Sequence, residues 1–453
     1  MCDDLTRRGF LVGCSSAIAG LAGARFNSVA FGDPVANEEI LIYVFLRGGM
    51  DGLSLVPPIG GTDRGHYEAA RPGLQVPASG PGAALPLSGS FGLHPSAQPL
   101  LPLFQDGKLA IVQAVGMSSV VNKSHFDAMQ WIELGTPGSA HVDTGWLTRH
   151  LTTASNLPPS PVMPSLAVGD LQPVSLLGHL ETLNLDDPDS FHSDNGPWLW
   201  RDAQRTALRN IFESSSSWLH DGGVQALDAV DIVQLNISGP YTPSNGAVYP
   251  EGDFGDQLQV LAQMIKLDLG LQVATIDFGG WDTHEGQGAG SSGYLADLLA
   301  ELTGGLAAFY TDLDGSGVAN YTNRMTVVVQ SEFGRELLEN SDDGTEHGYG
   351  NLMLVLSGNA IGGLHGTWPG LASGQLVDGT DLAVTTDYRQ VISEILIRRM
   401  CNSQVYDVFP GYANYQPLGI VGGPDLTPTG GSDMIFSDGF ESGDFSAWTD
   451  LTS

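Results

Sequence analysis

The chain has 453 residues, of which 42% are hydrophobic, so it can bury a large core as one big α/β domain or as two ordinary domains. Its 51 acidic and 18 basic side chains give a formal net charge of -33. This charge opposes binding to nucleic acid and to anionic membrane surfaces, so we expect no nucleic-acid partner. An acidic surface most often serves solubility, and it also suits a protein that binds cations.

The first 30 residues have the pattern of a twin-arginine export signal. Arg7 and Arg8 precede a mild apolar stretch at 11–24, and small residues at 28–30 provide a cleavage site. The apolar stretch is short and interrupted by glycine and serine, so we expect no transmembrane span in the mature protein. The pattern predicts transfer by the twin-arginine translocase to the periplasm or to the outside of the cell.

The cysteines restrict the kind of metal site that the chain can build. Cys2 and Cys14 fall within the predicted signal, which leaves Cys401 alone in the mature chain. One cysteine excludes an intramolecular disulfide and a zinc site built from thiolates. Any bound metal ion must therefore be held by oxygen and imidazole ligands.

Apolar runs that are typical of buried parallel strands recur between residues 36 and 420, which we predict to form one α/β domain. They lie at 39–46, 109–115, 273–278, 325–330 and 352–356. Amphipathic stretches at 254–269 and 294–313 predict helices between some of them. Strands alternating with helices predict a doubly wound, mostly parallel sheet flanked by helices.

Two regions depart from this pattern. Residues 154–250 are rich in proline, serine, asparagine and aspartate, which predicts an inserted loop-rich region or lid within the domain. Residues 421–453 begin with a stretch rich in glycine, proline and aspartate, which predicts a linker followed by a short C-terminal tail. The role of this tail does not follow from its sequence.

Polar residues follow the predicted strands, where the carboxyl ends of parallel strands form a ligand crevice. Asp51 follows the first run, Asp282 and His284 follow the third, and Glu332 follows the fourth, while His347 precedes the last run. Carboxylates and imidazoles in such a crevice predict a metal site. Each motif also has a structural alternative: a turn aspartate that bonds its own loop, an Asp–His pair that orders a loop, or a Glu–Arg ion pair.

Three further residues are candidates for catalysis. Ser124 and His125 open a predicted helix, where the helix dipole and free N–H groups stabilise an anion and would assist attack on a phosphate or sulfate ester. Serine is also a preferred N-cap, which is the structural alternative. Arg335 supplies a cation that could hold an anionic substrate.

Other chemistries lack their motifs. The chain contains no Gly-x-Ser-x-Gly elbow, no His-Glu-x-x-His and no Walker loop. The sequence therefore does not favour an ATP-binding protein or an ordinary esterase.

Taken together, these motifs resemble one bacterial family, the domain of unknown function 1501. The resemblance runs in order over roughly residues 1 to 400. It rests on the paired arginines and on Leu46-Arg47-Gly48-Gly49-Met50-Asp51-Gly52, Ser124-His125-Phe126, Thr144-Gly145-Trp146, Asp282-Thr283-His284, Ser331-Glu332-Phe333-Gly334-Arg335, Gly344-Thr345-Glu346-His347-Gly348 and Thr386-Asp387-Tyr388-Arg389.

The family is similar in fold to the alkaline phosphatase and sulfatase superfamily, and the resemblance implies roles for six residues. Asp51 would be the first metal ligand, Ser124 the nucleophile, Asp282 and His284 a ligand pair, Glu332 a further ligand, and His347 the last histidine. The superfamily usually has Asp-His where this chain has Glu332-Phe333, so one imidazole ligand is absent and a full two-metal site is not implied. Glu346 replaces a usual aspartate and can serve as an outer hydrogen-bonding partner.

The expected function is therefore that of an exported metal-dependent hydrolase of phosphate or sulfate esters. Its cofactor would be a divalent ion, with zinc, calcium, magnesium and manganese all open, and its substrate a small anionic ester or a glycan. The alternative is a non-catalytic envelope or ligand-binding protein on a degenerate hydrolase fold.

Overall fold

The computed structural model describes residues 37–431, apart from 159–162, 189–197, 238–239 and 414. The predicted export signal and the tail from residue 432 onward lie outside the described residues. Within the described part of the chain, no helix combines the length and the apolar character needed to cross a membrane.

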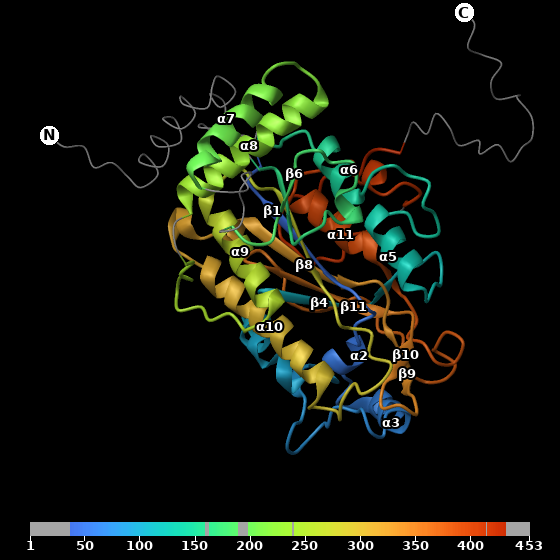
Figure 1. Cartoon of the computed structure of the whole chain (residues 1–453). Helices are drawn as coiled ribbons and strands as arrows, with labels where there is room; N and C mark the ends of the chain where they lie inside the picture. The colour runs from blue at the N-terminus through green and yellow to red at the C-terminus, as the bar shows by residue number, and fades with distance from the viewer. Residues whose placement is uncertain (1–36, 159–162, 189–197, 238–239, 414, 432–453) are drawn as a thin grey trace, which may run out of the picture.

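A nine-stranded sheet forms the centre of the described part of the chain (Figure 1). It contains β1 (Ile40–Leu46), β4 (Leu109–Gly116), β5 (Ser165–Val168), β6 (Thr182–Leu185), β7 (Val273–Phe278), β8 (Met325–Ser331), β11 (Asn351–Ser357), β12 (Gly363–His365) and β13 (Thr386–Asp387). The order is β12-β4-β11-β8-β1-β7-β5-β6, with β13 paired to β4. Strand β11 pairs antiparallel with β4 and β8, and the other pairings of this sheet are parallel. The predicted mostly parallel sheet is confirmed.

The sheet separates two hydrophobic cores because successive side chains of a strand point to opposite faces. On β1, Ile42 and Val44 join one core, whereas Tyr43 and Phe45 join the other. Figure 1 shows helices on both faces, as the doubly wound prediction requires. One face carries α9 (Asp253–Leu267) and α10 (Tyr294–Leu313), and the other carries α5 (His125–Leu134), α6 (Trp146–Thr153), α11 (Tyr388–Arg398) and α12 (Val405–Val408).

The region predicted as a loop-rich insertion, 154–250, supplies two strands of the main sheet. Strands β5 and β6 continue the sheet beyond β7, and helices α7 (Arg201–Phe212) and α8 (Trp218–Asn236) pack against each other at one end of the molecule (Figure 1). The strands have only four residues each, which is too short to produce a clear apolar run in the sequence.

Smaller elements complete the fold. Two hairpins, β2–β3 and β9–β10, and several short helices lie outside the main sheet. They are α2 (Gly52–Leu55), α3 (Gly61–Ala70), β2 (Leu85–Ser88), β3 (Phe91–Leu93), the 3-10 helix η2 (Pro95–Leu100), α4 (Leu101–Gln105), the 3-10 helix η3 (Val174–Leu176), β9 (Arg335–Glu339) and β10 (Thr345–His347).

The chain after α12 completes the second core through one buried carboxylate. Glu394 of α11 accepts hydrogen bonds from the backbone N–H groups of Leu418, Gly419 and Ile420, at 2.5, 3.0 and 2.7 Å. Ile420 and Val421 are fully buried against α11 and its neighbours. The packing continues beyond Val421, where the sequence predicts the linker to begin: Leu426 packs against the same core, and Thr429 forms backbone hydrogen bonds with Ser403 and Tyr406.

Replacing this carboxylate should loosen the whole C-terminal segment. We expect Glu394→Ala to lower the free energy of unfolding by about 3 kcal/mol or more, because several buried N–H groups lose a charged acceptor. Urea denaturation measures the change. On the same helix, Gln390→Ala removes one hydrogen bond, to the Gln416 carbonyl, and should cost about 1 kcal/mol or less. Equal midpoints for the two variants would contradict this role of Glu394.

Candidate metal centre

The candidate site lies at the carboxyl ends of three adjacent parallel strands. Strand β1 is paired with β7 on one side and with β8 on the other, so the loops that follow these strands meet at one edge of the sheet. The loop after β7 carries Asp282 and His284, and the loop after β8 carries Glu332. His125 is the first residue of α5, and His347 ends β10.

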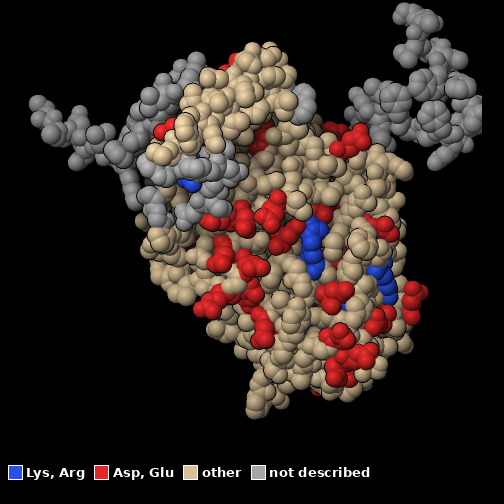
Figure 2. All heavy atoms as spheres, viewed as in Figure 1, with Lys and Arg blue, Asp and Glu red and all other residues tan. Residues whose placement is uncertain are grey.

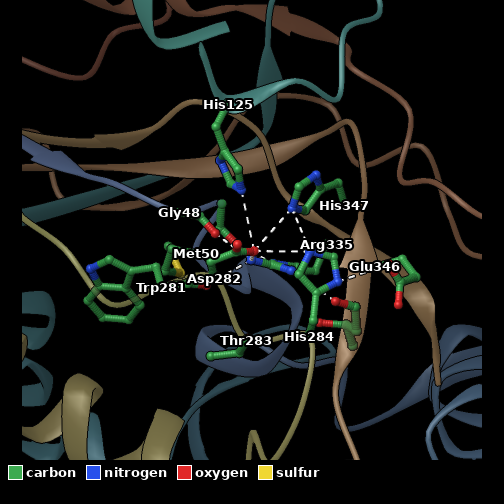
Figure 3. A network of polar contacts seen from close by, with 12 residues as sticks. Gly48, Met50, His125, Trp281, Asp282, Thr283, His284, Arg335, Glu346 and His347 are labelled. Atoms are coloured by element: carbon green, nitrogen blue, oxygen red, sulfur yellow. Dashed lines mark hydrogen bonds and ion pairs between the residues drawn. The ribbon is translucent and has the colours of Figure 1, made fainter. Parts of the chain in front are cut away.

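Three imidazoles converge on one carboxylate (Figure 3). Ligand atoms of His125, Asp282 and His347 all lie within 4.8 Å of one another. Oδ1 of Asp282 lies 3.3 Å from Nε2 of His125 and 3.0 Å from Nε2 of His347. Nε2 of His284 lies 3.1 Å from the same oxygen and 2.8 Å from Nε2 of His347. The structure thus brings together three of the five predicted metal ligands, and it adds His125.

Each imidazole is oriented by an oxygen at its other nitrogen. The Nδ1 contacts are His125 with Oε1 of Glu332 at 2.6 Å, His284 with Oε2 of Glu346 at 2.9 Å, and His347 with the Lys123 carbonyl at 2.8 Å. Carboxylate and carbonyl oxygens accept, so each Nδ1–H donates. The neutral rings then direct the lone pairs of their Nε2 atoms toward Asp282. This is the arrangement by which proteins fix histidines as metal ligands.

The donor set fits a divalent cation. Without a cation, lone pairs of neutral imidazoles face a carboxylate oxygen, and Nε2 of His125 is buried with no hydrogen-bond partner among the described groups. Imidazole nitrogens and a carboxylate oxygen are ordinary ligands of zinc and related ions. His125, Asp282 and His347 can therefore hold a metal ion, with His284 beside them.

The electrostatics of these residues agree with that fit. Burial raises the pKa of Asp282, but the hydrogen bond and the positive charge of Arg335 outweigh it and hold this pKa well below its usual range. The hydrogen bond to Glu332 raises the pKa of His125, whereas burial lowers the pKa of His347. Asp282 is therefore ionised at neutral pH, and its half-exposed side chain leaves the site open to solvent.

Glu332 orients His125 through a hydrogen bond. Its Oε1 accepts from His125 and from the Gly48 backbone N–H at 2.8 Å, and its Oε2 accepts from Ser331 at 2.8 Å. Both oxygens of this fully buried side chain are thus engaged. The contacts favour an orienting role over the ligand role that the resemblance implies.

Arg335 is structural, contrary to the expectation that it holds an anionic substrate. The side chain is fully buried, so no substrate can reach it. Its guanidinium donates to the carbonyls of Gly48, Gly49, Trp281 and Thr345, and to Oδ1 of Asp282 at 2.7 Å. Arg335 therefore ties the site loops together and positions Asp282.

Asp51 lies apart from the three imidazoles and is engaged elsewhere. Its Oδ2 pairs with Arg71 at 2.6 Å, and both side chains are completely buried. Ser54 and Gln287 donate to the same carboxylate, each at 2.8 Å. Burial opposes ionisation, but Arg71 keeps the pKa of Asp51 below its usual value. The geometry favours a structural role for Asp51, because the carboxylate lone pairs that a metal ion would need already accept hydrogen bonds.

Ser124 and Phe333 complete the surroundings of the site. Ser124 is exposed at the N-cap of α5, and its side chain accepts no capping hydrogen bond. Phe333 is buried, with ring centroids 4.9 Å from His125 and 4.8 Å from His347. An apolar ring thus fills the sequence position at which the superfamily usually has an imidazole ligand.

Several supporting groups were not predicted from the sequence. They include Arg71, Gln287 and the carbonyl of Lys123. Arg71 and Gln287 belong to no motif because they meet Asp51 only through the fold, and a carbonyl contributes without any side-chain signal. The sequence gives one indication of the Lys123 carbonyl: Lys123 directly precedes the candidate residue Ser124.

Acidic side chains outnumber basic ones on the surface in view. Figure 2 shows them over the face formed by α9 and α10 and near the β9–β10 hairpin, with few basic side chains between them. Exposed examples are Asp253, Asp256 and Asp297 on the helices and Asp342, Asp343 and Glu346 in the hairpin. This surface raises the local concentration of cations.

The Asp51–Arg71 pair gives a test of its structural role. We expect Arg71→Met to lower the free energy of unfolding by about 3–5 kcal/mol, because it leaves an uncompensated buried carboxylate. Arg324→Met removes a more exposed pair with Asp268 and should cost about 1 kcal/mol or less. Chemical denaturation compares the two variants. A small loss for Arg71→Met would show that Asp51 is free to serve another purpose.

Metal content tests the cluster itself. We expect near-stoichiometric divalent metal in the folded protein, and its loss in His125→Ala and His347→Ala, because each change removes a ligand. Glu332→Gln should weaken metal binding about 10–100-fold, since it removes the negative charge that strengthens the hydrogen bond orienting His125. Elemental analysis and metal titration measure both effects, with His66→Ala on the exposed side of α3 as the control. Protein that holds none of zinc, manganese, magnesium and calcium after incubation with each would contradict the metal site.

Comparisons with known proteins give one family match and several distant structures, of which two are described here. The family described as a protein of unknown function (DUF1501) matches residues 242–400. No curated protein matches the chain. The lipoteichoic acid synthase LtaP from Listeria monocytogenes is 10% identical, with a TM-score of 0.29, over 91% of this chain and 81% of that chain.

The second structure is the phosphonate monoester hydrolase of Agrobacterium radiobacter, 12% identical with a TM-score of 0.29, over 83% of this chain and 78% of that chain. The family match covers the segment that supplies Asp282, His284, Glu332 and His347. Residues 242–400 are therefore similar to the DUF1501 family, which is the family that the sequence motifs resemble.

Proposed function

We propose that the protein is an exported, metal-dependent hydrolase of phosphate or sulfate esters. The proposal depends on one observation: three imidazoles have their Nδ1 atoms held by oxygens while their Nε2 atoms converge on Asp282. A purely structural cluster gains nothing from directing several lone pairs at one anion. The resemblance of the motifs to the phosphatase and sulfatase superfamily supports the choice of substrate class.

Zinc is the metal that we propose, held as a single ion. Imidazole-rich donor sets suit zinc better than calcium or magnesium, which prefer oxygen. Phe333 occupies one position of a second ligand set with an apolar ring, and Asp51 is occupied by Arg71. Bound there, the ion would lower the pKa of a coordinated hydroxyl and offset the charge of the transferred group.

Ser124 is the proposed nucleophile. Its hydroxyl is exposed, free of a capping bond and next in sequence to His125, at the N-terminus of α5. The helix dipole there offsets negative charge on a phosphoryl or sulfuryl group. The serine oxygen would form the new bond to phosphorus or sulfur as the ester oxygen leaves with a proton. Water would then release the acid and restore the hydroxyl.

Export and location belong to the same proposal. The twin-arginine pattern at residues 6–11 would send the protein, already folded, to the periplasm or beyond. Folding before transfer would allow the metal to be acquired first, which suits a site assembled from α5, β10 and two loops of the sheet.

Two substitutions test the mechanism with p-nitrophenyl phosphate and p-nitrophenyl sulfate as substrates. We expect Asp282→Asn and Ser124→Ala each to lower kcat/KM about a hundredfold or more, because one removes the charged ligand and the other the attacking oxygen. Asp297→Asn, an exposed change on α10, is the matched control. Circular dichroism checks that all three variants are folded.

The outcomes separate the candidate functions. If Ser124→Ala keeps full activity while Asp282→Asn loses it, the nucleophile is a water molecule and not the serine. Full activity in Asp282→Asn would remove the metal centre from the reaction. A zinc-loaded wild-type protein that hydrolyses neither ester would overturn the hydrolase proposal in favour of a ligand-binding protein.

A further inference from the structure

A second concave site lies away from the metal centre, beside the start of α3 and the β2–β3 hairpin at the lower end of the molecule in Figure 1. It has a volume of about 380 Å³. None of its lining residues belongs to the imidazole cluster. Its chemistry therefore needs an explanation of its own.

A largely buried amide lines this pocket. Gln113 is only 6% exposed, and no hydrogen bond of its side chain is found among the described residues. Its amide offers both donors and acceptors, and its atoms are not sealed away from solvent. Gln113 is therefore placed to bind something that enters the pocket.

The backbone of β4 is distorted at the same place. Val112 pairs with Met353 and Val115 with Asn351, so Gln113 and Ala114 stand together opposite one residue of β11. This is a β-bulge, and Ala114 has a left-handed φ of 54° that alanine rarely adopts. Bulges of this kind redirect side chains, and strain of this kind is concentrated at functional sites.

An aromatic wall faces the pocket and is held in place. The Trp368 ring meets Phe91 edge to face, with centroids 4.9 Å apart. Nε1 of Trp368 donates to Asp63 at 2.7 Å, and the other oxygen of Asp63 accepts from the Leu371 backbone at 3.0 Å. The aromatic surface is thus positioned before a ligand arrives, which limits the entropy lost on binding.

The remaining lining restricts the class of ligand. Hydroxyl groups of Thr62, Ser88 and Ser90 stand at the rim, and the described lining contains no lysine, arginine or histidine. A phosphate, sulfate or carboxylate would find no cation and would face Asp63. A neutral ring with several hydroxyl groups suits the pocket, because its apolar face can lie on an aromatic wall while its edge bonds amide and hydroxyl groups.

We propose that this pocket is a binding site for a neutral saccharide ring, separate from the metal centre. Gln113 supplies the buried hydrogen bonds, and Trp368 with Phe91 supplies the apolar contact. On the proposed hydrolase, such a site would hold a glycan, but the saccharide site does not require the hydrolase to be active.

Isothermal titration with glucose, galactose, N-acetylglucosamine and cellobiose tests the proposal on the folded chain. We expect saturable binding of at least one sugar, and a loss of affinity of about tenfold or more in Gln113→Leu. Because the amide has no partner among the described residues, Gln113→Leu should unfold at the same or a higher temperature. A structural role for Gln113 would instead lower the unfolding temperature.

A second variant leaves the core untouched. Thr62→Trp fills the rim of the pocket from the first turn of α3 and should abolish sugar binding, whereas Ala69→Trp, exposed on the same helix and outside the lining, should not. Metal content should stay unchanged in all these variants, so this test fails or succeeds independently of the metal centre. No binding of any of the four sugars, or binding of adenosine in their place, would overturn the proposal. Sugar binding that survives Thr62→Trp and Gln113→Leu would do the same.

Discussion

The geometry of the candidate centre depends on the buried guanidinium of Arg335. It joins the loop after β1, through Gly48 and Gly49, to the loop after β7, through Trp281 and Asp282, and both to β10. A planar group with five fixed donors can satisfy carbonyls from three segments at once, which a lysine could not. Glycine at position 48 permits the approach, because a Cβ there would lie 2.5 Å from the Asp282 nitrogen. The carboxylate that the imidazoles face is thus fixed by the fold.

The imidazoles around this carboxylate are held in fixed orientations by hydrogen bonds. Each imidazole is supported at Nδ1, yet the supports differ: Glu332 is fully buried, whereas Glu346 is half exposed. Substituting Glu332 therefore disturbs the core side of the centre, and substituting Glu346 disturbs only its solvent side. Phe333 packs against both His125 and His347, so these two rings have little freedom to turn away.

The sequence predicted the sheet well because its central strands are long and apolar on both faces. Runs such as those of β1 and β8 have no other reasonable structure, and the polar residues after them had to meet at one edge. Asp282 and His284 were recognisable for that reason, whereas His347 lies in the polar loop before the last run. Strands β5 and β6 were missed because four residues cannot display a period, and the loops around them hid the rest of the signal.

The roles of individual polar residues were harder to predict because they depend on partners distant in sequence. Nothing near Asp51 shows that Arg71 will take its charge, and nothing near Arg335 shows that five oxygens will surround it. The motif at His125 indicated catalysis, but only the fold brings Glu332 to its Nδ1 and Asp282 to its Nε2. Gln113 carried no signal, since a glutamine within an apolar strand reads as a minor interruption until the bulge redirects it.

The acidic surface affects any reaction at this centre through long-range electrostatics. Fixed negative charge over α9, α10 and the β9–β10 hairpin draws divalent ions toward the site and repels the anionic esters that would be its substrates (Figure 2). The two effects respond oppositely to dissolved salt, because counterions shield both over about 10 Å at moderate ionic strength. Low ionic strength therefore favours metal binding, and high ionic strength favours encounter with an anionic substrate. A protein of this charge works best where the metal ion is bound early and the ionic strength is high.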